Sequence, residues 1–308
     1  MQNTHFLVGI MFLLSKIFKS NKSKTVNNWL DVYIKILLAR KLKYKTLEMK
    51  TYLIKVIRRE IGNKNIRDVS PLDISRLIQI YIDQDKRPSA KSMYHLLRDI
   101  FREAYAQDWN NRNPAEPIKC PKVYVKRSRM VLNEFKKLVD AADKNPKYHY
   151  IRDAMLAGVV TAQRRSDISE MKKNQVKRNH LLIEQQKTGS KIALPVKLKC
   201  KKIGLSIYDV INKSSAQFVV TKRGEQVLPK QITSGFARIR DKIFSRDYWS
   251  GTPTTFHEIR SLAERLYREQ NIDTMTLLGH KSQQTTDRYN DNRGREYKKL
   301  KITRATYL

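Results

Sequence analysis

The chain has 308 residues, and its 63 Lys and Arg against 29 Asp and Glu give a formal net charge of +34 at pH 7. This length accommodates two domains, each with its own core, more readily than one very large domain. Because the charge is spread over a chain that is 40% hydrophobic, the composition excludes a disordered basic tail and predicts a folded protein with a polyanionic partner. Nucleic acid is favoured, since Lys and Arg bind phosphates whatever the base sequence, while an anionic membrane or an acidic ribosomal surface stays open.

Cysteine usage narrows the chemistry and the compartment. Cys120 and Cys200 are the only cysteines, and they form no CxxC pair. The sequence therefore excludes a disulfide framework and a cysteine-based zinc site, and it fits a reducing compartment.

The first apolar segment, residues 5–18, is HFLVGIMFLLSKIF. No lysine or arginine precedes it, it has no small-residue cleavage site, Lys16 interrupts it, and it is too short to span a bilayer comfortably. A packed or partner-binding helix is favoured over a signal peptide, and membrane attachment stays open.

Residues 25–108 have the periodicity of helices. The segment KTLEMKTYLIKVIRREIG is rich in lysine and arginine and ends at Gly62. The segment SPLDISRLIQIYI begins with Ser70 as N-cap, Pro71 at the first helical position and Asp73 three residues after the cap. Two further segments place apolar side chains on one helical face: Trp29, Leu30, Tyr33, Ile34, Leu37 and Leu38 in the first, and Met93, Leu96, Leu97, Ile100, Phe101 and Ala104 in the second. Four such helices predict a small bundle.

The segment NNRNPAEPIKCPKVYVKRSR, residues 110–129, predicts a boundary. Its three prolines exclude helix, and its lysines and arginines make it strongly basic. It is either a solvated linker or a basic strap that passes along a nucleic-acid backbone.

The second half of the chain is mixed. In HLLIEQQKTGSKIALPV, residues 180–196, two strand-like runs flank Lys187-Thr188-Gly189-Ser190, which predicts a β-hairpin with Lys187 beside the turn.

The segment TPTTFHEIRSLAERLYREQ predicts a helix with Thr255 and Glu258 as capping box. At about 100° per residue, His257 and Arg260 lie near each other and away from the apolar stripe of the helix, beside an N-terminus that favours an anion. Taken alone, an ordinary surface His-x-x-Arg is the favoured interpretation.

In VVTAQRRSDISEMKK, an apolar run leads into Arg164, Arg165 and Asp167, where a buried loop is expected to turn into a helix. An arginine there is suited to binding phosphate, with Asp167 one turn on to orient it. A weak surface ion pair is the alternative.

The segment LLGHKSQQTTDRYN, residues 277–290, predicts a short helix ended by Gly279, then His280, then a polar helix with Ser282 as N-cap. The hydroxyl of Tyr289 is a candidate nucleophile, but a free phenol ionises near pH 10 and needs cationic neighbours to react.

These segments together resemble the tyrosine recombinase, or phage integrase, family. The resemblance covers about residues 25–302 and rests on TAQRRSDISEMK, KTGSKIALP, PTTFHEIRSLAERLY, LLGHKS and DNRGRE, with NNWLDVYIKIL and KYKTL nearer the start. Its specificity lies in the order and spacing of a constellation: Arg164, Lys187, His257, Arg260, Leu278-Gly279-His280 and Tyr289.

The resemblance implies a mainly α protein with a small β-sheet (α+β). It implies a helical, SAM-like core-binding domain over residues 25–112, a basic linker over 113–129, and a mixed α/β catalytic domain with a C-terminal tail over 130–308. Residues 1–24 are expected to be a short apolar extension without the N-terminal arm-binding domain that some members carry. A second departure is Ala162, which stands where the family usually has glycine.

The implied activity is site-specific DNA recombination without metal or nucleotide cofactor. Tyr289 would form a 3′-phosphotyrosyl link and release a 5′-hydroxyl, while Lys187 protonates the departing oxygen. Arg164 and Arg260 would hold the non-bridging oxygens. His257 and His280 would donate hydrogen bonds and help take the proton of the tyrosine. Asp167 would support Arg164 and the neighbouring histidine.

The implied partners are double-stranded attachment-site DNA and further copies of the chain in a homotetramer, where residues 290–302 would pack in trans. A host DNA-bending protein and an excisionase are further candidate partners, no membrane is involved, and the location is the DNA in the bacterial cytoplasm. Candidate DNA contacts are Lys55 and Arg59 in the groove, Lys43 and Lys45 at the backbone, and Lys126 and Arg127 in the linker. Solvated surface charge is the alternative for most of them.

Other functions stay open at this point. A relaxing topoisomerase or a telomere resolvase shares the chemistry but carries different flanking domains. A DNA-binding remnant with decayed catalysis is the alternative from a different class, and the complete constellation argues against it. A metal-dependent nuclease or transposase needs clustered carboxylates, which the sequence does not offer.

Overall fold

A computed structural model describes residues 24–124, 126–213 and 216–290. The chain divides between Tyr124 and Val125 into two compact units, here called the bundle unit and the mixed unit. The predictions for the apolar segment at 5–18 and for the tail beyond Asn290 concern residues outside this description.

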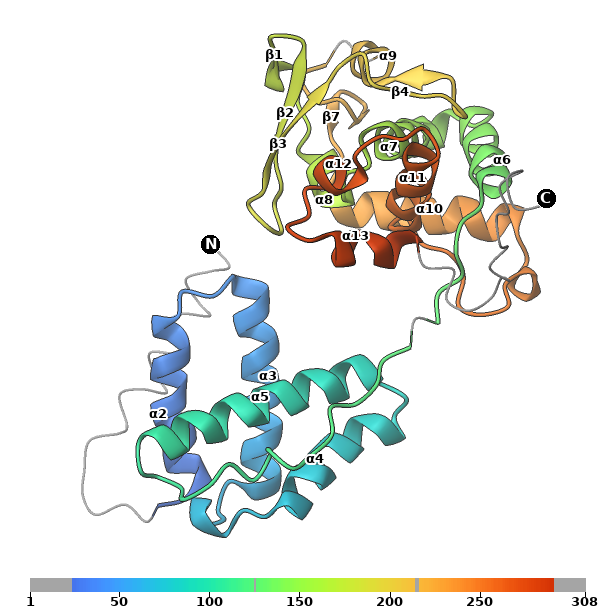
Figure 1. Ribbon diagram of the computed structural model, residues 1–308. Coiled ribbons are helices and arrows are strands. Elements are labelled where there is room, and N and C mark those ends of the chain that lie inside the picture. The colour runs from blue at the N-terminus through green and yellow to red at the C-terminus, as the bar shows by residue number, and fades with distance from the viewer. Residues whose placement is uncertain (1–23, 125, 214–215, 291–308) are drawn as a thin grey trace, which may run out of the picture. The chain divides into compact units, whose positions relative to one another are not determined.

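Within residues 24–124, the bundle unit has four helices, as predicted, with one 3-10 turn at Ile66–Asp68 (Figure 1). Its core includes Trp29, Tyr33 and Phe101, and the indole of Trp29 donates a hydrogen bond to the Ile100 carbonyl at 3.1 Å. The predicted capping box of Ser70 and Asp73 is present. The helices are α2 (Val26–Ala39), α3 (Tyr44–Ile61), α4 (Pro71–Asp83) and α5 (Arg87–Ala106).

The segment after α5 is free of helix and strand up to Tyr124, as its prolines predict. It stays attached to the bundle unit, since Ala115 is buried in the core and Asn113 donates to the Arg98 carbonyl at 3.0 Å.

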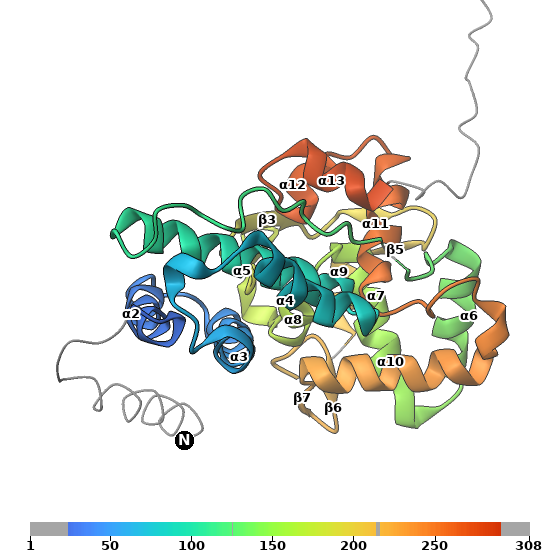
Figure 2. The same ribbon diagram turned by 90° about the horizontal axis from the view of Figure 1, so that it is seen from below.

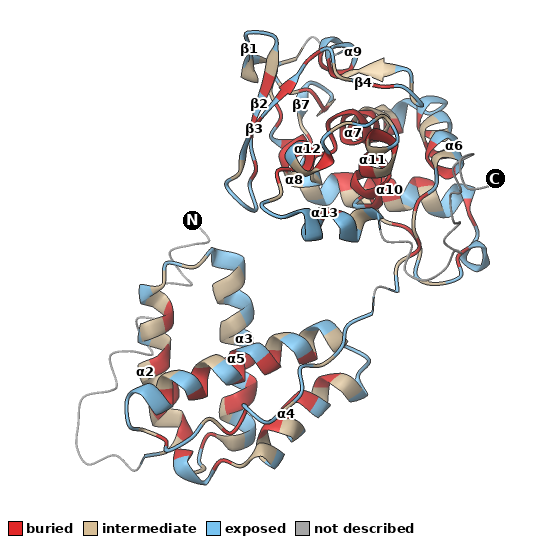
Figure 3. Cartoon of the chain, viewed as in Figure 1, coloured by how far each residue is buried: buried red, intermediate tan, exposed pale blue. Residues whose placement is uncertain are grey.

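The mixed unit is organised around one buried helix, α7 (His149–Thr161), which packs against α6, α9, α10 and α11. Figure 3 shows α7 and α11 as buried elements surrounded by more exposed ones. Gly158 allows a close approach here, because a Cβ on it would lie 3.2 Å from the Ile259 side chain. The other helices are α6 (Leu132–Asp143), α8 (Arg165–Ser169), α9 (Ile207–Asn212), α10 (Pro229–Ile243), α11 (Glu258–Arg268), α12 (Thr274–Leu278) and α13 (Gln283–Asn290).

The sheets of the mixed unit are small and antiparallel. The largest has the order β1-β2-β3, with β1 (Val176–Lys177), β2 (His180–Glu184) and β3 (Lys191–Pro195). Its β2–β3 pair is the predicted hairpin, whose buried and exposed side chains alternate because only one face is covered. Two-stranded sheets join β4 (Lys199–Cys200) to β5 (Leu205–Ser206) and β6 (Thr221–Lys222) to β7 (Glu225–Gln226).

Two predictions for the helix after Thr252 were wrong. The N-cap of α11 is His257, and Glu258 forms no capping box with Thr255 because its carboxylate accepts from Arg127 Nε at 2.9 Å. Arg260 is not on an open face but only 1% exposed, since the α11 surface outside the apolar stripe is covered by other segments of the unit.

Candidate active site

Side chains from six separate segments of the mixed unit meet at one cleft of about 560 Å³. Figure 2 shows α12 and α13 beside α11, and the Tyr289 carbonyl at the end of α13 accepts from Ser261 Oγ in the first turn of α11. Of the residues predicted from sequence, five line the cleft: Arg164, Lys187, His257, His280 and Tyr289. The sixth, Arg260, lies beneath the tyrosine ring.

The Arg260 guanidinium is fixed by neutral acceptors. Nη1 donates to the Ala162 carbonyl at 2.5 Å, and Nη2 donates to the Leu278 carbonyl at 2.5 Å and to His280 Nε2 at 3.3 Å. Burial, followed by the charge of Arg164, lowers the pKa of Arg260 to about 10. The Tyr289 ring covers this group, with its centroid 5.7 Å from the guanidinium carbon. The positive charge is therefore held in the protein without a neutralising carboxylate bond.

Arg164 enters the cleft from the sharp turn between α7 and α8. Ala162 ends α7 in the left-handed region at φ 54°, a conformation that favours glycine and explains why glycine is usual here in the family that the sequence resembles. Arg164 is the N-cap of α8, and its Nη1 donates to Gln185 Oε1 at 2.7 Å. The turn thus places a half-buried guanidinium at the cleft wall.

His257 lies beside the tyrosine hydroxyl. Its Nε2 lies 3.5 Å from Tyr289 Oη, and the two rings are 5.8 Å apart. Desolvation, helped by the charges of Arg127, Arg260, Arg164 and Lys187, lowers the pKa of His257 to about 4. His257 lines the cleft, and at physiological pH its imidazole is neutral, which is the form that can accept a proton.

His280 follows the left-handed Gly279 (φ 62°) that ends α12, as predicted. Because an arginine only donates, the 3.3 Å contact makes His280 Nε2 an acceptor, and Nδ1 then carries the hydrogen shared with Thr286 Oγ1 at 3.0 Å. Desolvation and the charges of Arg260 and Arg164 lower the pKa of His280 to about 4. In this arrangement the ring supports Arg260 and lies 5.3 Å from the Tyr289 ring.

Lys187 lies in the turn of the β2–β3 hairpin and reaches the cleft, as its place in the sequence predicts. The Asp167 carboxylate supports this hairpin, because Oδ1 accepts from the Gln186 amide at 2.9 Å. The sequence suggested that Asp167 orients Arg164. The contact that the structure provides is instead with the residue beside Lys187.

The segment after Val125 adds two arginines to the site. Arg127, predicted as a DNA contact, lines the cleft and binds Glu258 and Thr255. Arg129 Nη2 donates to the Tyr289 carbonyl at 2.9 Å, and Ser261 Oγ donates to the same carbonyl at 3.0 Å. The backbone of the tyrosine is thereby anchored to α11 and to the basic segment. Lys126 is exposed and lines a neighbouring hollow with Arg246.

Sequence reasoning missed the polar side chains that hold the catalytic candidates. Gln163, Gln185, Thr286, Ser261 and Arg129 contact them directly or through a shared carbonyl. The only signal for Gln163 and Gln185 was their position, one residue before Arg164 and two before Lys187.

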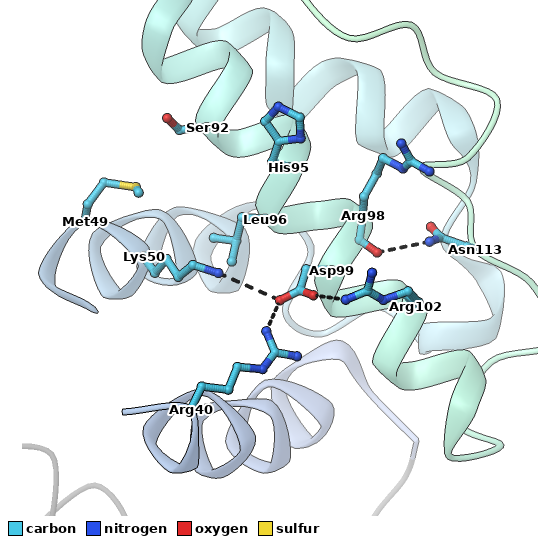
Figure 4. Close-up of a pocket in the computed structure, with 10 residues that line it drawn as sticks. All are labelled: Arg40, Met49, Lys50, Ser92, His95, Leu96, Arg98, Asp99, Arg102 and Asn113. Atoms are coloured by element: carbon cyan, nitrogen blue, oxygen red, sulfur yellow. Dashed lines mark hydrogen bonds and ion pairs between the residues drawn. The ribbon is translucent and has the colours of Figure 1, made fainter. Parts of the chain in front are cut away.

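In the bundle unit, the predicted DNA contacts Lys43, Lys45, Lys55 and Arg59 are all exposed on or at the start of α3. A basic hollow that the sequence did not indicate lies between α3 and α5, with Asp99 at its centre (Figure 4). Arg102 donates to Asp99 at 2.6 Å, Lys50 lies 3.8 Å from it, and Arg40 also pairs with it.

Metal-binding clusters and membrane-spanning helices are both absent from the described residues. No group of three or more His, Cys, Asp or Glu side chains among them is placed to hold a metal ion. No helix within residues 24–290, gaps excepted, is long and apolar enough to cross a membrane.

Both units match known protein families. Residues 24–120 match the phage integrase central domain, and residues 128–296 match the phage integrase family. Prophage integrase IntE of Escherichia coli (strain K12) is 38% identical over 299 residues, which cover 91% of this chain and 79% of the relative. The integrase of Escherichia phage lambda is 36% identical over 296 residues, which cover 94% of this chain and 82% of the relative.

Solved structures give the same result. A lambda integrase dimer bound to a COC′ core site matches with a TM-score of 0.82 and 36% identity, over 91% of this chain and 81% of that one. A lambda integrase tetramer bound to a Holliday junction matches with a TM-score of 0.83 and 36% identity, over 92% and 82%. The chain belongs to the phage integrase family of tyrosine site-specific recombinases.

Proposed function

We propose that this chain exchanges DNA strands at attachment sites through a covalent link to Tyr289. The observation that carries the proposal is the position of the Tyr289 hydroxyl, 3.5 Å from a neutral His257 in a cleft lined by Arg164 and Lys187. A neutral imidazole accepts the phenol proton, and the surrounding cations stabilise the phenolate that attacks.

The cleavage step balances without an external reagent. The Tyr289 oxygen forms a bond to the scissile phosphorus, and the bond from phosphorus to the 5′-oxygen breaks. His257 takes the phenol proton, and Lys187 donates a proton to the departing 5′-oxygen, which is otherwise a poor leaving group. Because the phosphotyrosyl ester keeps the energy of the broken bond, a 5′-hydroxyl from the partner strand reverses the step without ATP.

Arg164 and Arg260 neutralise the non-bridging oxygens in the transition state, where preorganised donors contribute most. In the structure, Arg260 is 1% exposed and lies under the Tyr289 ring. For a phosphate to contact Arg260, the Tyr289 ring has to move off the guanidinium. The same movement brings the tyrosine hydroxyl toward the phosphate in the cleft. His280 acts by holding Arg260, and Asp167 by holding the Lys187 hairpin.

The proposed substrate is duplex DNA with core-type sites, and the recombination intermediate is a Holliday junction. The solved complexes of lambda integrase, a dimer on a core site and a tetramer on a Holliday junction, support this choice. The bundle unit contributes Lys43, Lys45, Lys55 and Arg59, and the basic hollow around Asp99 offers further cations to phosphates. A homotetramer assembles on DNA, with a host DNA-bending protein and an excisionase as accessory partners in the bacterial cytoplasm. The element moved is a prophage or a related mobile element.

A nicked suicide substrate tests the proposal. Wild-type protein is expected to form a covalent adduct in excess EDTA, and Tyr289→Phe is expected to form none. Tyr208→Phe is a matched control, because Tyr208 is an exposed tyrosine of the same unit, 58% exposed. An adduct that persists in Tyr289→Phe, or that requires a divalent metal, contradicts the mechanism. Core-site binding without any wild-type adduct identifies a catalytically decayed remnant instead.

A further inference from the structure

Two buried glutamines lie directly behind the cleft. Gln163 and Gln185 are each 1% exposed, and they come from the turn before α8 and from the end of β2. Gln185 Nε2 donates to Gln163 Oε1 at 2.8 Å, which joins the two side chains. Buried side-chain amides are costly unless their donors and acceptors are satisfied, and all four polar atoms of this pair have partners.

The orientation of both amides follows from the backbone. Gln163 Nε2 donates to the carbonyls of Thr161 at 2.8 Å and Leu277 at 3.0 Å, which can only accept. Gln163 Oε1 is then the acceptor that faces Gln185, so Gln185 must present its Nε2 to it and to the Leu278 carbonyl at 2.9 Å. Gln185 Oε1 then faces donors. The carbonyls of Thr161 and Leu277 thus determine, through Gln163, which way the Gln185 amide is oriented.

The acceptor oxygen of Gln185 contacts two parts of the reaction centre. It accepts from Arg164 Nη1 at 2.7 Å and from Thr188 Oγ1 at 2.8 Å, and Thr188 follows Lys187 in the hairpin turn. On the donor side, the Leu278 carbonyl that Gln185 binds also accepts from Arg260 Nη2 at 2.5 Å. One amide therefore links both arginines and the lysine turn.

Gly279 shows how tightly this amide is enclosed. A Cβ at position 279 would lie 2.9 Å from Gln185 Nε2 and 3.0 Å from its Cδ, and the backbone there has φ +62°. Four hydrogen bonds fix the Gln185 amide, so it can move away from such a Cβ only by breaking or bending them. A side chain at position 279 therefore displaces the amide, even where the helix end tolerates the substitution.

We propose that Gln185 is a positioning residue for strand cleavage. It holds Arg164 and the Lys187 turn in fixed positions relative to Arg260, and Gln163 orients its amide. The inference rests on the proposed function of this cleft. Its physical basis is that transition-state contacts tolerate little displacement. A misplacement of about 1 Å can lower rates about 10²-fold, and the outer-shell partners of metal ligands, which orient reacting groups in a comparable way, typically contribute about 10–100-fold to activity.

Single-turnover cleavage of a suicide substrate, with saturating protein, tests this role in the full-length chain. Gln185→Met keeps the length of the side chain and removes its hydrogen bonds, while Gly279→Ala keeps the glutamine and displaces it. Both are expected to lower the cleavage rate about 10–100-fold, with the Kd for DNA within about twofold of wild type. Gln270→Met is the matched control, since Gln270 also bridges backbone groups of the mixed unit, at Lys199 and Lys201, but lies outside the cleft.

Modified substrates separate positioning from general damage. Sulfur in place of the scissile 5′-oxygen leaves without a proton and bypasses Lys187, and a methylphosphonate carries no charge for Arg164 to neutralise. Recovery of the Gln185→Met rate toward wild type on either substrate supports the inference. An unchanged rate on normal DNA, a defect that neither substrate reduces, or a parallel loss of DNA binding overturns it while wild-type cleavage leaves the proposed function standing. Absence of a wild-type adduct overturns both.

Discussion

The basic hollow of the bundle unit and the cleft of the mixed unit handle positive charge in opposite ways. In the hollow, Arg40 pairs with Asp99 and Glu103, and the hydrogen bond to Asp99 raises the pKa of Arg40. In the cleft, Arg260 donates to carbonyl oxygens and an imidazole, and burial lowers its pKa to about 10. The first arrangement stabilises the free protein, whereas the second leaves charge available for an anion.

This difference agrees with the tasks proposed for the two regions, which are attraction of DNA for the hollow and strand cleavage for the cleft. Paired cations at a surface contribute to stability and to salt-dependent attraction for DNA, and both effects are spread over many residues. A buried arginine whose hydrogen bonds go to neutral acceptors, such as Arg260, binds strongly only where negative charge concentrates, as it does on a phosphate in its transition state. The difference predicts that substitutions in the cleft alter chemistry more than affinity, and that substitutions in the hollow alter stability more than chemistry.

The largest expected effect comes from Arg260. Arg260→Ala is expected to slow cleavage about 10³-fold, because a preorganised charged donor to the phosphate is lost. Binding to core-site DNA, measured by gel shift, should change less than about threefold, since 63 Lys and Arg share the affinity. Arg260→Lys keeps the positive charge. If this variant folds and still cleaves slowly, the defect comes from the missing guanidinium and not from misfolding.

Arg102→Ala in the hollow is the control for Arg260, because it removes an arginine that is 68% exposed and paired with Asp99. Its cleavage rate at saturating DNA should stay within about twofold of wild type, as expected for a surface ion pair. If Arg260→Ala loses binding and cleavage equally, the distinction between the two regions fails.

Lys187→Ala is expected to lower cleavage about 10²–10³-fold, because general acid catalysis of the leaving oxygen is lost. Lys191→Ala is a matched control on the same hairpin, where the lysine is 80% exposed and lies 3.9 Å from Glu184. A 5′-bridging sulfur should restore the Lys187→Ala rate. A defect that remains on that substrate would assign Lys187 a role other than proton donation.

Asp99→Asn tests the hollow. Tyr33 and Arg40 hydrogen-bond to Asp99 and, against the opposing effect of burial, lower its pKa, so the charged form stabilises the fold. The substitution is expected to lower the free energy of unfolding of the bundle unit by about 1–3 kcal/mol, as hydrogen bonds to charged groups are lost. Thermal unfolding measures this, and a stability equal to wild type would show that the network is not stabilising. Cleavage at saturating DNA and at a temperature where the variant is folded should be unchanged.

The smallest expected effect is that of pH on the rate near neutrality. His257 and His280 have pKa values near 4 and are neutral above about pH 5.5, so their titration should leave the cleavage rate unchanged between pH 6 and 8. A rate that rises with a midpoint near 6.5 would contradict this.

Stability should respond to the same histidines in a lower pH range. Their pKa values are lower in the folded than in the unfolded chain, so the unfolded chain binds more protons as pH falls from about 6.5 through about 4. The contribution of the two neutral histidines to the free energy of unfolding is therefore complete above pH 6.5 and is lost as the pH falls toward 4. The double variant His257→Gln, His280→Gln should show a shallower loss of Tm over this range.

The local sequence was sufficient to predict the features that depend on near neighbours. Ser70 and Asp73 cap α4 because the two side chains are three residues apart, and Gly279 ends α12 because glycine tolerates a left-handed backbone. The hairpin followed from two alternating runs around Lys187. The family followed from the spacing of six side chains, because that spacing is much more specific than any single motif.

Which polar groups those side chains contact depends instead on the tertiary fold. Thr255 and Glu258 have the spacing of a capping box, yet Glu258 binds Arg127, which is 131 positions away in the chain. The helical wheel placed Arg260 outside the apolar stripe, but carbonyls of Ala162 and Leu278 make its burial possible. Gln185 owes its orientation to Gln163 and Leu278. Charge and hydrogen-bond partners depend on distance in space, and the local sequence pattern does not contain that distance.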